Sequence, residues 1–194
     1  FDSVLGESPL PVMLFRLVAV LLAALFRPRL GFLDESAIRL RVWPNDLDAN
    51  LHMNNSRYLL AMDVGRWELV VRTGFWRELR RRRWFPVVGS ATLRFRRSLD
   101  PFQRYRLVTR LVAWDEKWCV LEQRFERGGH VHAVGRVKAL FRGPQGHVST
   151  AALLAAGLHP RATDIGGNCG RTVRVAVGTG AVTVRVVGGD PVAP

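Results

Sequence analysis

Cysteine and recognisable nucleophile motifs are scarce in this chain. Its 194 residues contain two cysteines, Cys119 and Cys169, which form neither a disulfide framework nor a set of ligands at zinc spacing. We therefore expect a reducing, cytoplasmic environment. No Gly-x-Ser-x-Gly segment is present and neither cysteine lies near a histidine motif, so a serine or cysteine nucleophile is not indicated. The sequence predicts no metal site and no bound cofactor.

Acidic residues are also few compared with basic ones. The chain has 16 Asp and Glu against 29 Lys and Arg, a net charge of +13, and its lysines are Lys117 and Lys138. Such a surface favours phosphorylated ligands, acidic proteins, anionic lipid or nucleic acid, and arginine favours bidentate contacts with phosphate or carboxylate. Nucleic-acid binding has charge alone in its favour, so we do not expect it.

No hydrophobic run reaches the length of an ordinary membrane-spanning helix. Residues Leu10 to Phe26 are apolar except for Arg16, whereas a span needs about 20 apolar residues. A secretory signal would have cations before the run, but here Arg27 and Arg29 follow it. We expect a helix that lies on a bilayer surface or on the protein, with a single-span anchor as the next alternative. The protein would then be cytoplasmic and peripheral to, or anchored in, a membrane through residues 10–29.

Periodicity predicts a strand followed by a long helix. Ser36 to Trp43 alternates apolar residues with arginines, which is typical of a half-buried strand. From Asn54 onward, apolar and small residues recur at three- and four-residue spacing over about five turns. These are Tyr58, Met62, Gly65 and Leu69. Asn54 is a suitable N-cap, Gly74 a suitable C-terminal stop, and Gly65 in mid-helix indicates close packing.

The remainder predicts an antiparallel sheet. Four alternating segments are separated by turn residues: Val87–Leu99, Arg104–Trp114, Trp118–Glu126 and His130–Arg142. We expect consecutive segments to pair as antiparallel neighbours, giving about five strands wrapped around one central helix, an α+β hotdog fold. The expected organisation is an apolar helix in 1–35, a hotdog domain in 36–160, and a Gly/Val-rich tail in 161–194. A hairpin around residues 178–180 is possible within that tail.

The decapeptide DLDANLHMNN, residues 46–55, combines two carboxylates, three carboxamides and a histidine. A calcium loop is excluded, because Leu51 and Arg57 stand where glycine and a bidentate glutamate are needed. Capping of the following helix accounts for one or two of the polar groups. A carboxylate such as Asp48 beside free helix N–H groups could also attack or activate water against a polarised carbonyl. The residues alone leave capping and chemistry both open for Asp48.

The same segment resembles a known family motif. Residues 46–58 match the D-x-D-x-x-x-H-x-N-N-x-x-Y signature of hotdog thioesterases of the 4-hydroxybenzoyl-CoA thioesterase type. The strongest likeness is to the thioesterase superfamily member six group and its bacterial relatives, which share the apolar N-terminal segment and the turn Trp114–Trp118. The resemblance implies a homodimer or homotetramer that hydrolyses acyl-CoA or acyl-ACP thioesters.

Residue roles follow from this resemblance. It implies that Asp48 is the nucleophile or general base and that the N–H of Asn55 polarises the thioester carbonyl. Asn50 and His52 would assist catalysis or brace the loop. Three further residues are candidates for contact with substrate: Tyr58, Met62 and Asp63. Asp63 has an alternative role in a salt bridge with Arg66, and the alternative for the whole protein is a catalytically silent acyl- or lipid-binding hotdog.

Overall fold

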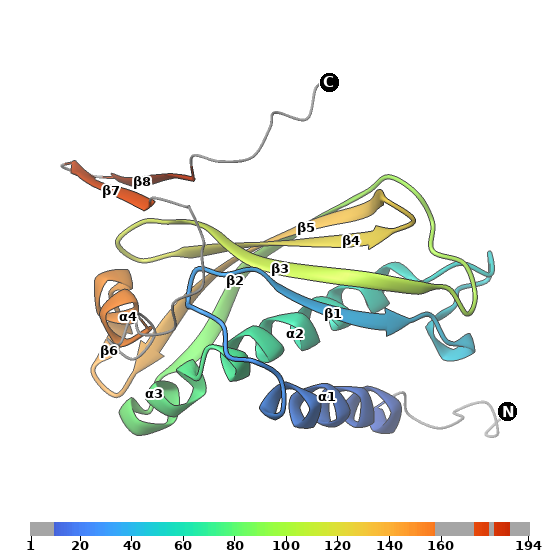
Figure 1. The fold of residues 1–194 in the computed structure, drawn as a ribbon, viewed down its shortest axis with the longest axis horizontal. Helices are drawn as coiled ribbons and strands as arrows, with labels where there is room; N and C mark the ends of the chain where they lie inside the picture. Colours follow the sequence, from blue (N-terminus) through green and yellow to red (C-terminus); the bar gives the residue numbers. More distant parts are fainter. Residues whose placement is uncertain (1–9, 158–172, 179–180, 187–194) are drawn as a thin grey trace, which may run out of the picture.

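A curled antiparallel sheet and one long helix organise the chain (Figure 1). The computed structural model describes residues 10–157, 173–178 and 181–186. Its elements up to residue 157 are α1 (Leu10–Leu25), β1 (Ser36–Arg41), the 3-10 turn η1 (Pro44–Asp46), α2 (Asn55–Arg72), α3 (Phe75–Arg82), β2 (Phe85–Phe95), β3 (Arg104–Trp114), β4 (Cys119–Arg127), β5 (His130–Gly143), β6 (Gly146–Val148) and α4 (Thr150–Gly157). The long helix, the strand before it and the antiparallel sheet are as the sequence predicts.

The strand order corrects one prediction. The sheet runs β1-β3-β4-β5-β2, with β6 paired to β5, so β2 is not the neighbour of β3. Instead β2 pairs with β5 at the edge opposite β1. The connection from Phe95 to Arg104 is a crossing rather than a tight turn. Within this connection Leu99 is completely buried, and its carbonyl accepts the Met53 N–H. The Phe102 N–H donates to the carbonyl of Val42, the residue that follows β1.

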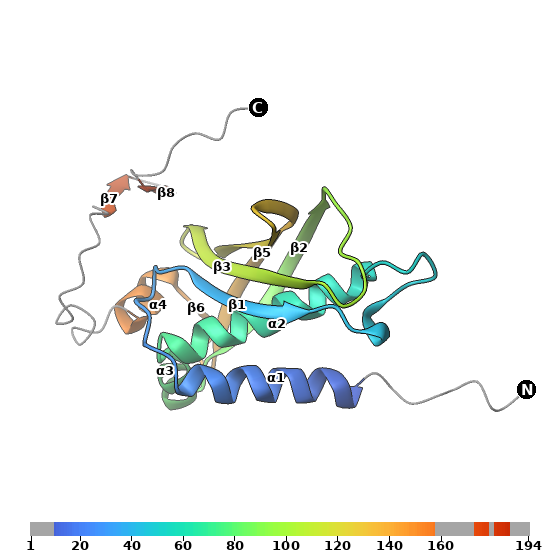
Figure 2. The same ribbon diagram turned by 45° about the vertical axis from the view of Figure 1, so that its right-hand side comes forward.

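Three layers are visible in both ribbon views (Figures 1 and 2). The sheet curls over α2, and α1 lies on the opposite side of α2. The main core forms between α2 and the concave face of the sheet, from residues such as Tyr58, Met62, Leu107, Phe125 and Val137. Ala24 of α1 is buried, and Leu17 and Val20 pack against the same core. The predicted packing of the N-terminal helix on the protein is therefore observed.

Gly65 lies where α2 comes closest to the sheet. A Cβ at this position would be 2.7 Å from Thr109 Oγ1 and 2.9 Å from Gln123 Nε2. Both neighbours are buried on the inner face of the sheet. The predicted close packing at Gly65 is confirmed, and it explains a residue that weakens the helix intrinsically. The helix ends at Thr73, and Gly74 follows in the left-handed region with φ of 75°.

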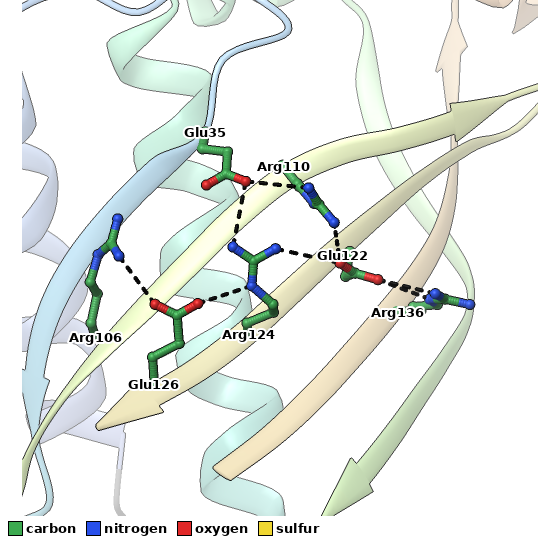
Figure 3. Close-up of polar contacts among 7 residues, drawn as sticks. All are labelled: Glu35, Arg106, Arg110, Glu122, Arg124, Glu126 and Arg136. Carbon is green, nitrogen blue, oxygen red and sulfur yellow. Dashed lines mark hydrogen bonds and ion pairs between the residues drawn. The ribbon is translucent and has the colours of Figure 1, made fainter. Parts of the chain in front are cut away.

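The outer face of the sheet carries a network of arginines and glutamates (Figure 3). Its members are Glu35, Arg106, Arg110, Glu122, Arg124, Glu126 and Arg136. Glu122 is buried, and its carboxylate lies 2.8 Å from the Arg110 guanidinium and 3.1 Å from the Arg136 guanidinium. Burial alone would raise the pKa of Glu122, but the hydrogen bonds from these two guanidinium groups outweigh it, and the pKa lies below its ordinary value.

Two further predictions concern a membrane-spanning helix and the C-terminal segment. Among the described residues, no helix combines the length and apolarity needed to cross a bilayer. The hairpin predicted in the C-terminal segment is present as β7 (Val173–Gly178) paired with β8 (Ala181–Val186), separate from the main sheet. The rest of the predicted tail and its boundary near residue 160 lie outside the described residues.

Candidate active site

Residues 43–54, the site loop, connect β1 to α2 through a narrow two-stranded turn. The Asn54 N–H donates to the Asp46 carbonyl at 2.8 Å, and the Asp48 N–H donates to the His52 carbonyl at 2.9 Å. Leu47 and Met53 form an isolated antiparallel bridge between these two pairs. Since His52 stands opposite Asp48, the Asp48 backbone is level with a residue two positions, or about 7 Å, before Asn54 and three positions before Asn55, where α2 begins.

The Asp48 carboxylate is held on one side only. Its Oδ1 accepts the N–H of Asn50 at 2.8 Å and the N–H of His52 at 3.3 Å, as in an Asx turn. Within the part of the chain that the structure describes, no hydrogen bond or ion pair engages its Oδ2. The group is half-buried. Asp48 therefore organises the loop with one oxygen and leaves the other available to a ligand or water.

The first turn of α2 presents a free donor. Asn54 is the N-cap, and its Oδ1 accepts the Ser56 N–H at 2.9 Å, which confirms the predicted capping. The next N–H, that of Asn55, has no acceptor among the described residues. Helix N-termini carry partial positive charge, so an unpaired N–H here can polarise a carbonyl or hold an oxyanion.

Asn50 and His52 lie on the solvent side of the site loop. Asn50 is exposed, and its backbone N–H supports Asp48. The His52 ring is 48% exposed, with Nε2 3.8 Å from Asp100 Oδ1. Between them, Leu51 adopts a left-handed conformation with φ of 58° and exposes two thirds of its side chain. Both polar side chains are therefore open to solvent.

The three residues considered for substrate contact divide between core and surface. Tyr58 is buried against Phe95 and Phe125, and burial raises its pKa to about 12. Met62 is fully buried within the main core. Asp63 is exposed and forms the predicted ion pair with Arg66. Asp63 is the member of this group that borders a cavity.

That cavity has a volume of about 220 Å³ and lies between α2, β2, β4 and β5. Its walls are mainly apolar, with Leu69, Val88 and Phe141 among them, and Asp63 and Arg66 supply charge. Asp63 follows Asn55 by eight residues, so the cavity begins about 12 Å along the helix from the free N–H. Cys119 also lines it, but burial, with a smaller contribution from Asp115, raises the pKa of this thiol to about 11. A protonated thiol of this kind is a poor nucleophile.

The structure adds one pair that sequence reasoning missed. Asp46 lies in η1, and its carboxylate is buried and forms a bidentate ion pair with Arg16 of α1. The two residues are 30 positions apart, so no local pattern connects them. Arg16 itself could have indicated this pair, because a single charged residue in an apolar helix needs a partner when the helix packs.

Comparison with known proteins agrees with this architecture. Residues 42–157 match the model of the Thioesterase-like superfamily, and the chain belongs to that family. Protein THEM6 of Danio rerio is 41% identical over 104 residues, 53% of this chain and 52% of that protein. A probable thioesterase of Saccharomyces cerevisiae is 30% identical over 84 residues, 42% of this chain and 36% of that protein. The chain thus spans about half the length of the first of these relatives, and less of the second.

The fold is the hotdog fold of solved thioesterases. The YbaW probable thioesterase of Escherichia coli superposes with a TM-score of 0.59 at 19% identity, over 63% of this chain and 97% of that one. At this identity the likeness establishes the fold alone. The predicted family and fold class are therefore confirmed.

Proposed function

We propose that this chain hydrolyses an acyl thioester, carried by CoA or by acyl carrier protein, to the free acid and thiol. In this mechanism Asp48 either attacks the thioester carbonyl and expels the thiolate, giving an acyl anhydride that water then hydrolyses, or removes a proton from a water that attacks the carbonyl and expels the thiolate. The Asn55 N–H stabilises the oxyanion that develops at the carbonyl oxygen. Asn50 and His52, on the exposed side of the site loop, orient the water or the thiol leaving group.

The proposal rests on two groups, one in the site loop and one at the start of α2: a carboxylate oxygen without a partner among the described residues, and a helix N–H without one. Oδ1 of Asp48 is fixed by two loop amides, so the carboxylate is pre-organised, while Oδ2 has no partner among the described residues. The Asn55 N–H begins α2 three residues beyond His52, the residue that pairs with Asp48. A nucleophile or base beside an oxyanion donor is the minimum that acyl transfer to water requires.

The cavity along α2 supports an extended acyl group as substrate. A chain that starts at the Asn55 N–H and follows the helix must extend about 12 Å before it reaches Asp63. Its distal carbons would then lie against Leu69 and the apolar walls of the cavity. Met62 and Tyr58 would act from within the core, where they support the helix along which the acyl chain lies.

The proposal is tested by replacing Asp48 and a matched carboxylate. Asp115 also uses a single oxygen to accept two turn amides, at 2.8 Å and 2.7 Å, but it lies in the β3–β4 turn, beyond the end of β3 away from the site loop. Hydrolysis of C4 to C18 acyl-CoAs and of a 4-hydroxybenzoyl thioester would be measured for wild type, Asp48→Asn and Asp115→Asn. We expect Asp48→Asn to lose at least about a hundredfold in kcat and Asp115→Asn to stay within about twofold. Equal activity of wild type and Asp48→Asn would exclude Asp48 as the catalytic group.

We further propose that the active form is a homodimer or homotetramer built on the edge of β2. This strand pairs with β5 on one side, and among the described residues no strand pairs with its other side. Phe85, Val88 and Phe95 on β2 are 52%, 49% and 43% exposed, and an edge with such apolar side chains favours pairing with another strand. Sedimentation of wild type and Val88→Asp tests this: a monomeric wild type would contradict the proposal.

A catalytically silent protein that binds acyl groups or lipid at a membrane is the alternative, and α1 favours it. The outward side of α1 and its end expose apolar side chains: Leu14, Phe15, Val18, Leu22, Leu25 and Phe26. Their spacing forms a continuous stripe of the kind that lies on bilayer surfaces. Co-sedimentation with anionic vesicles, together with acyl-CoA binding but no turnover of any thioester, would favour this alternative over the enzyme.

A further inference from the structure

We infer that Arg16 of helix α1 is a positioning residue for the site loop: its ion pair with Asp46 fixes the loop and the start of α2. This inference rests on the proposed function for its kinetic readout. It gives α1 a role in the reaction that is separate from any contact with a membrane.

Arg16 lies in an apolar helix and contacts the site loop. It is the one charged residue between Leu10 and Phe26, and its side chain is 19% exposed. Its Nη1 donates to Asp46 Oδ1 at 2.9 Å and its Nη2 to Asp46 Oδ2 at 2.7 Å. A fork of two parallel hydrogen bonds fixes direction as well as distance, so α1 and the site loop cannot rotate independently.

Asp46, the partner of Arg16, is buried. The residue is 1% exposed, and its Oδ2 also accepts the Trp43 N–H at 2.9 Å. Burial, together with the charge of the nearby Asp46, raises the pKa of Tyr105, which marks the surroundings as poorly solvated. A buried carboxylate that loses its cation is strongly destabilised. The loop conformation that buries Asp46 is therefore conditional on Arg16.

Backbone hydrogen bonds connect Asp46 to the two groups proposed to react, Asp48 and the Asn55 N–H. The Asp46 carbonyl accepts the Asn54 N–H, and Asn54 caps the helix whose next N–H belongs to Asn55. On the same two-stranded turn, Asp48 pairs with His52 directly beyond the Leu47–Met53 bridge. A shift of Asp46 would thus move both the carboxylate and the oxyanion donor, and small misplacements reduce rates strongly.

The other end of α1 supplies a matched control. Here Arg72 of α2 donates to the Pro28 carbonyl at 2.9 Å and pairs at 3.5 Å with Glu68, which is fully buried. The hydrogen bond to Pro28 ties the segment that follows α1 to α2, whereas the arginine–carboxylate pair lies within α2 itself. It lies at the C-terminal end of α2, far along the helix from Asn55. Replacing Arg72 should therefore disturb stability without moving the site loop.

The test compares Arg16→Met, Arg16→Lys and Arg72→Met, each assayed for thermal unfolding and for kcat and KM well below its melting temperature. We expect both methionine variants to melt at lower temperature. Arg16→Met should lose about tenfold to a hundredfold in kcat with KM nearly unchanged, and Arg16→Lys should recover part of that loss. Arg72→Met should keep the wild-type kcat. Equal kcat in wild type and both Arg16 variants would refute the inference, as would equal losses in Arg16→Met and Arg72→Met.

Amide exchange separates this inference from the proposed function. The Asn54 N–H is protected by the Asp46 carbonyl, so we expect it to exchange about tenfold faster in Arg16→Met, but not in Arg72→Met. A wild type that hydrolyses no thioester would refute the enzyme and leave this measurement intact. Unchanged exchange of Asn54 in both Arg16 variants would overturn the positioning role even if the enzyme is active.

Discussion

Replacing Gly65 with alanine should destabilise the protein even though alanine is the better helix former. The added methyl group would meet Thr109 Oγ1 at 2.7 Å and Gln123 Nε2 at 2.9 Å, both closer than ordinary contact. Neither neighbour is free to move, because Gln123 Nε2 donates to the Met62 carbonyl at 2.9 Å and to Thr109 Oγ1 at 3.0 Å. Gln123 Oε1 also accepts a hydrogen bond from Arg66 beside the cavity.

The magnitude follows from opposing contributions. Alanine gains about 1 kcal/mol over glycine in a helix interior. Overpacking of a closed core costs about 1 to 3 kcal/mol, and each buried hydrogen bond that is broken costs a further 1 to 3 kcal/mol, roughly. We therefore expect a net loss of about 2 kcal/mol in the free energy of unfolding. For a chain of this size the melting temperature should fall by about 4 to 8 °C.

Denaturant unfolding of a double-mutant cycle with Thr109→Ala tests the cause. Removal of Oγ1 deletes the nearest atom to the new methyl group, so Gly65→Ala should be less harmful in that background by about 1 kcal/mol. If Gly65→Ala instead raises stability by the helix-propensity difference, the close approach of α2 and the sheet is not what requires glycine. Independent, additive effects of the two substitutions would contradict the proposed contact.

Three further predictions concern the outer network, the cavity and the site loop. Because the pKa of Glu122 is lowered in the folded state, its contribution is present above the unfolded pKa of about 4.5 and is lost as the pH falls through the folded value. Glu122→Gln should accordingly flatten the acid limb of the stability profile, and an unchanged limb would contradict this. In a Cys169→Ser variant, the Cys119 thiol, with its pKa raised to about 11, should react with a disulfide reagent at pH 8 only after unfolding; fast reaction of the native variant would refute the burial of Cys119. Leu51→Asn, at a left-handed position that asparagine tolerates, should raise the free energy of unfolding by about 1 kcal/mol. Leu59→Asn, at an exposed helical position, should lower it, and a loss in both variants would argue against strain at Leu51.

Local features of the fold could be predicted because they depend on neighbouring residues. The period of α2, its Asn54 cap and the left-handed Gly74 all follow from spacing and residue type within one or two turns. The Asp63–Arg66 pair is likewise a contact between adjacent turns of a helix. The limits of β3, β4 and β5 were predicted to within one residue for the same reason, since alternation is a property of a few consecutive residues. The predicted end of β2 at Leu99 was wrong, because the strand ends at Phe95.

The position of β2 could not be predicted by the same logic. Its pairing with β5 depends on whether the segment after Phe95 turns back or crosses the sheet. Turn residues at Asp100 and Pro101 fit either path. The deciding factor is the burial of Leu99 beneath the site loop, together with a backbone hydrogen bond from Met53, contacts that span more than forty residues.

The candidate site shows the same division between local and distant determinants. The roles proposed for Asp48 and the Asn55 N–H could be inferred from one loop, because a carboxylate, an N-cap and a helix start occur within eight residues. What holds that loop is not local: Arg16 comes from α1, and Leu99 comes from the β2–β3 crossing. Arg16 precedes the loop in the sequence and binds the Asp46 carboxylate, whereas Leu99 follows the loop and accepts the Met53 N–H. A site built in this way depends on the N-terminal helix and the strand order as much as on its own motif, so a chain with an intact decapeptide but without these supports should bind substrate groups less precisely and turn them over more slowly.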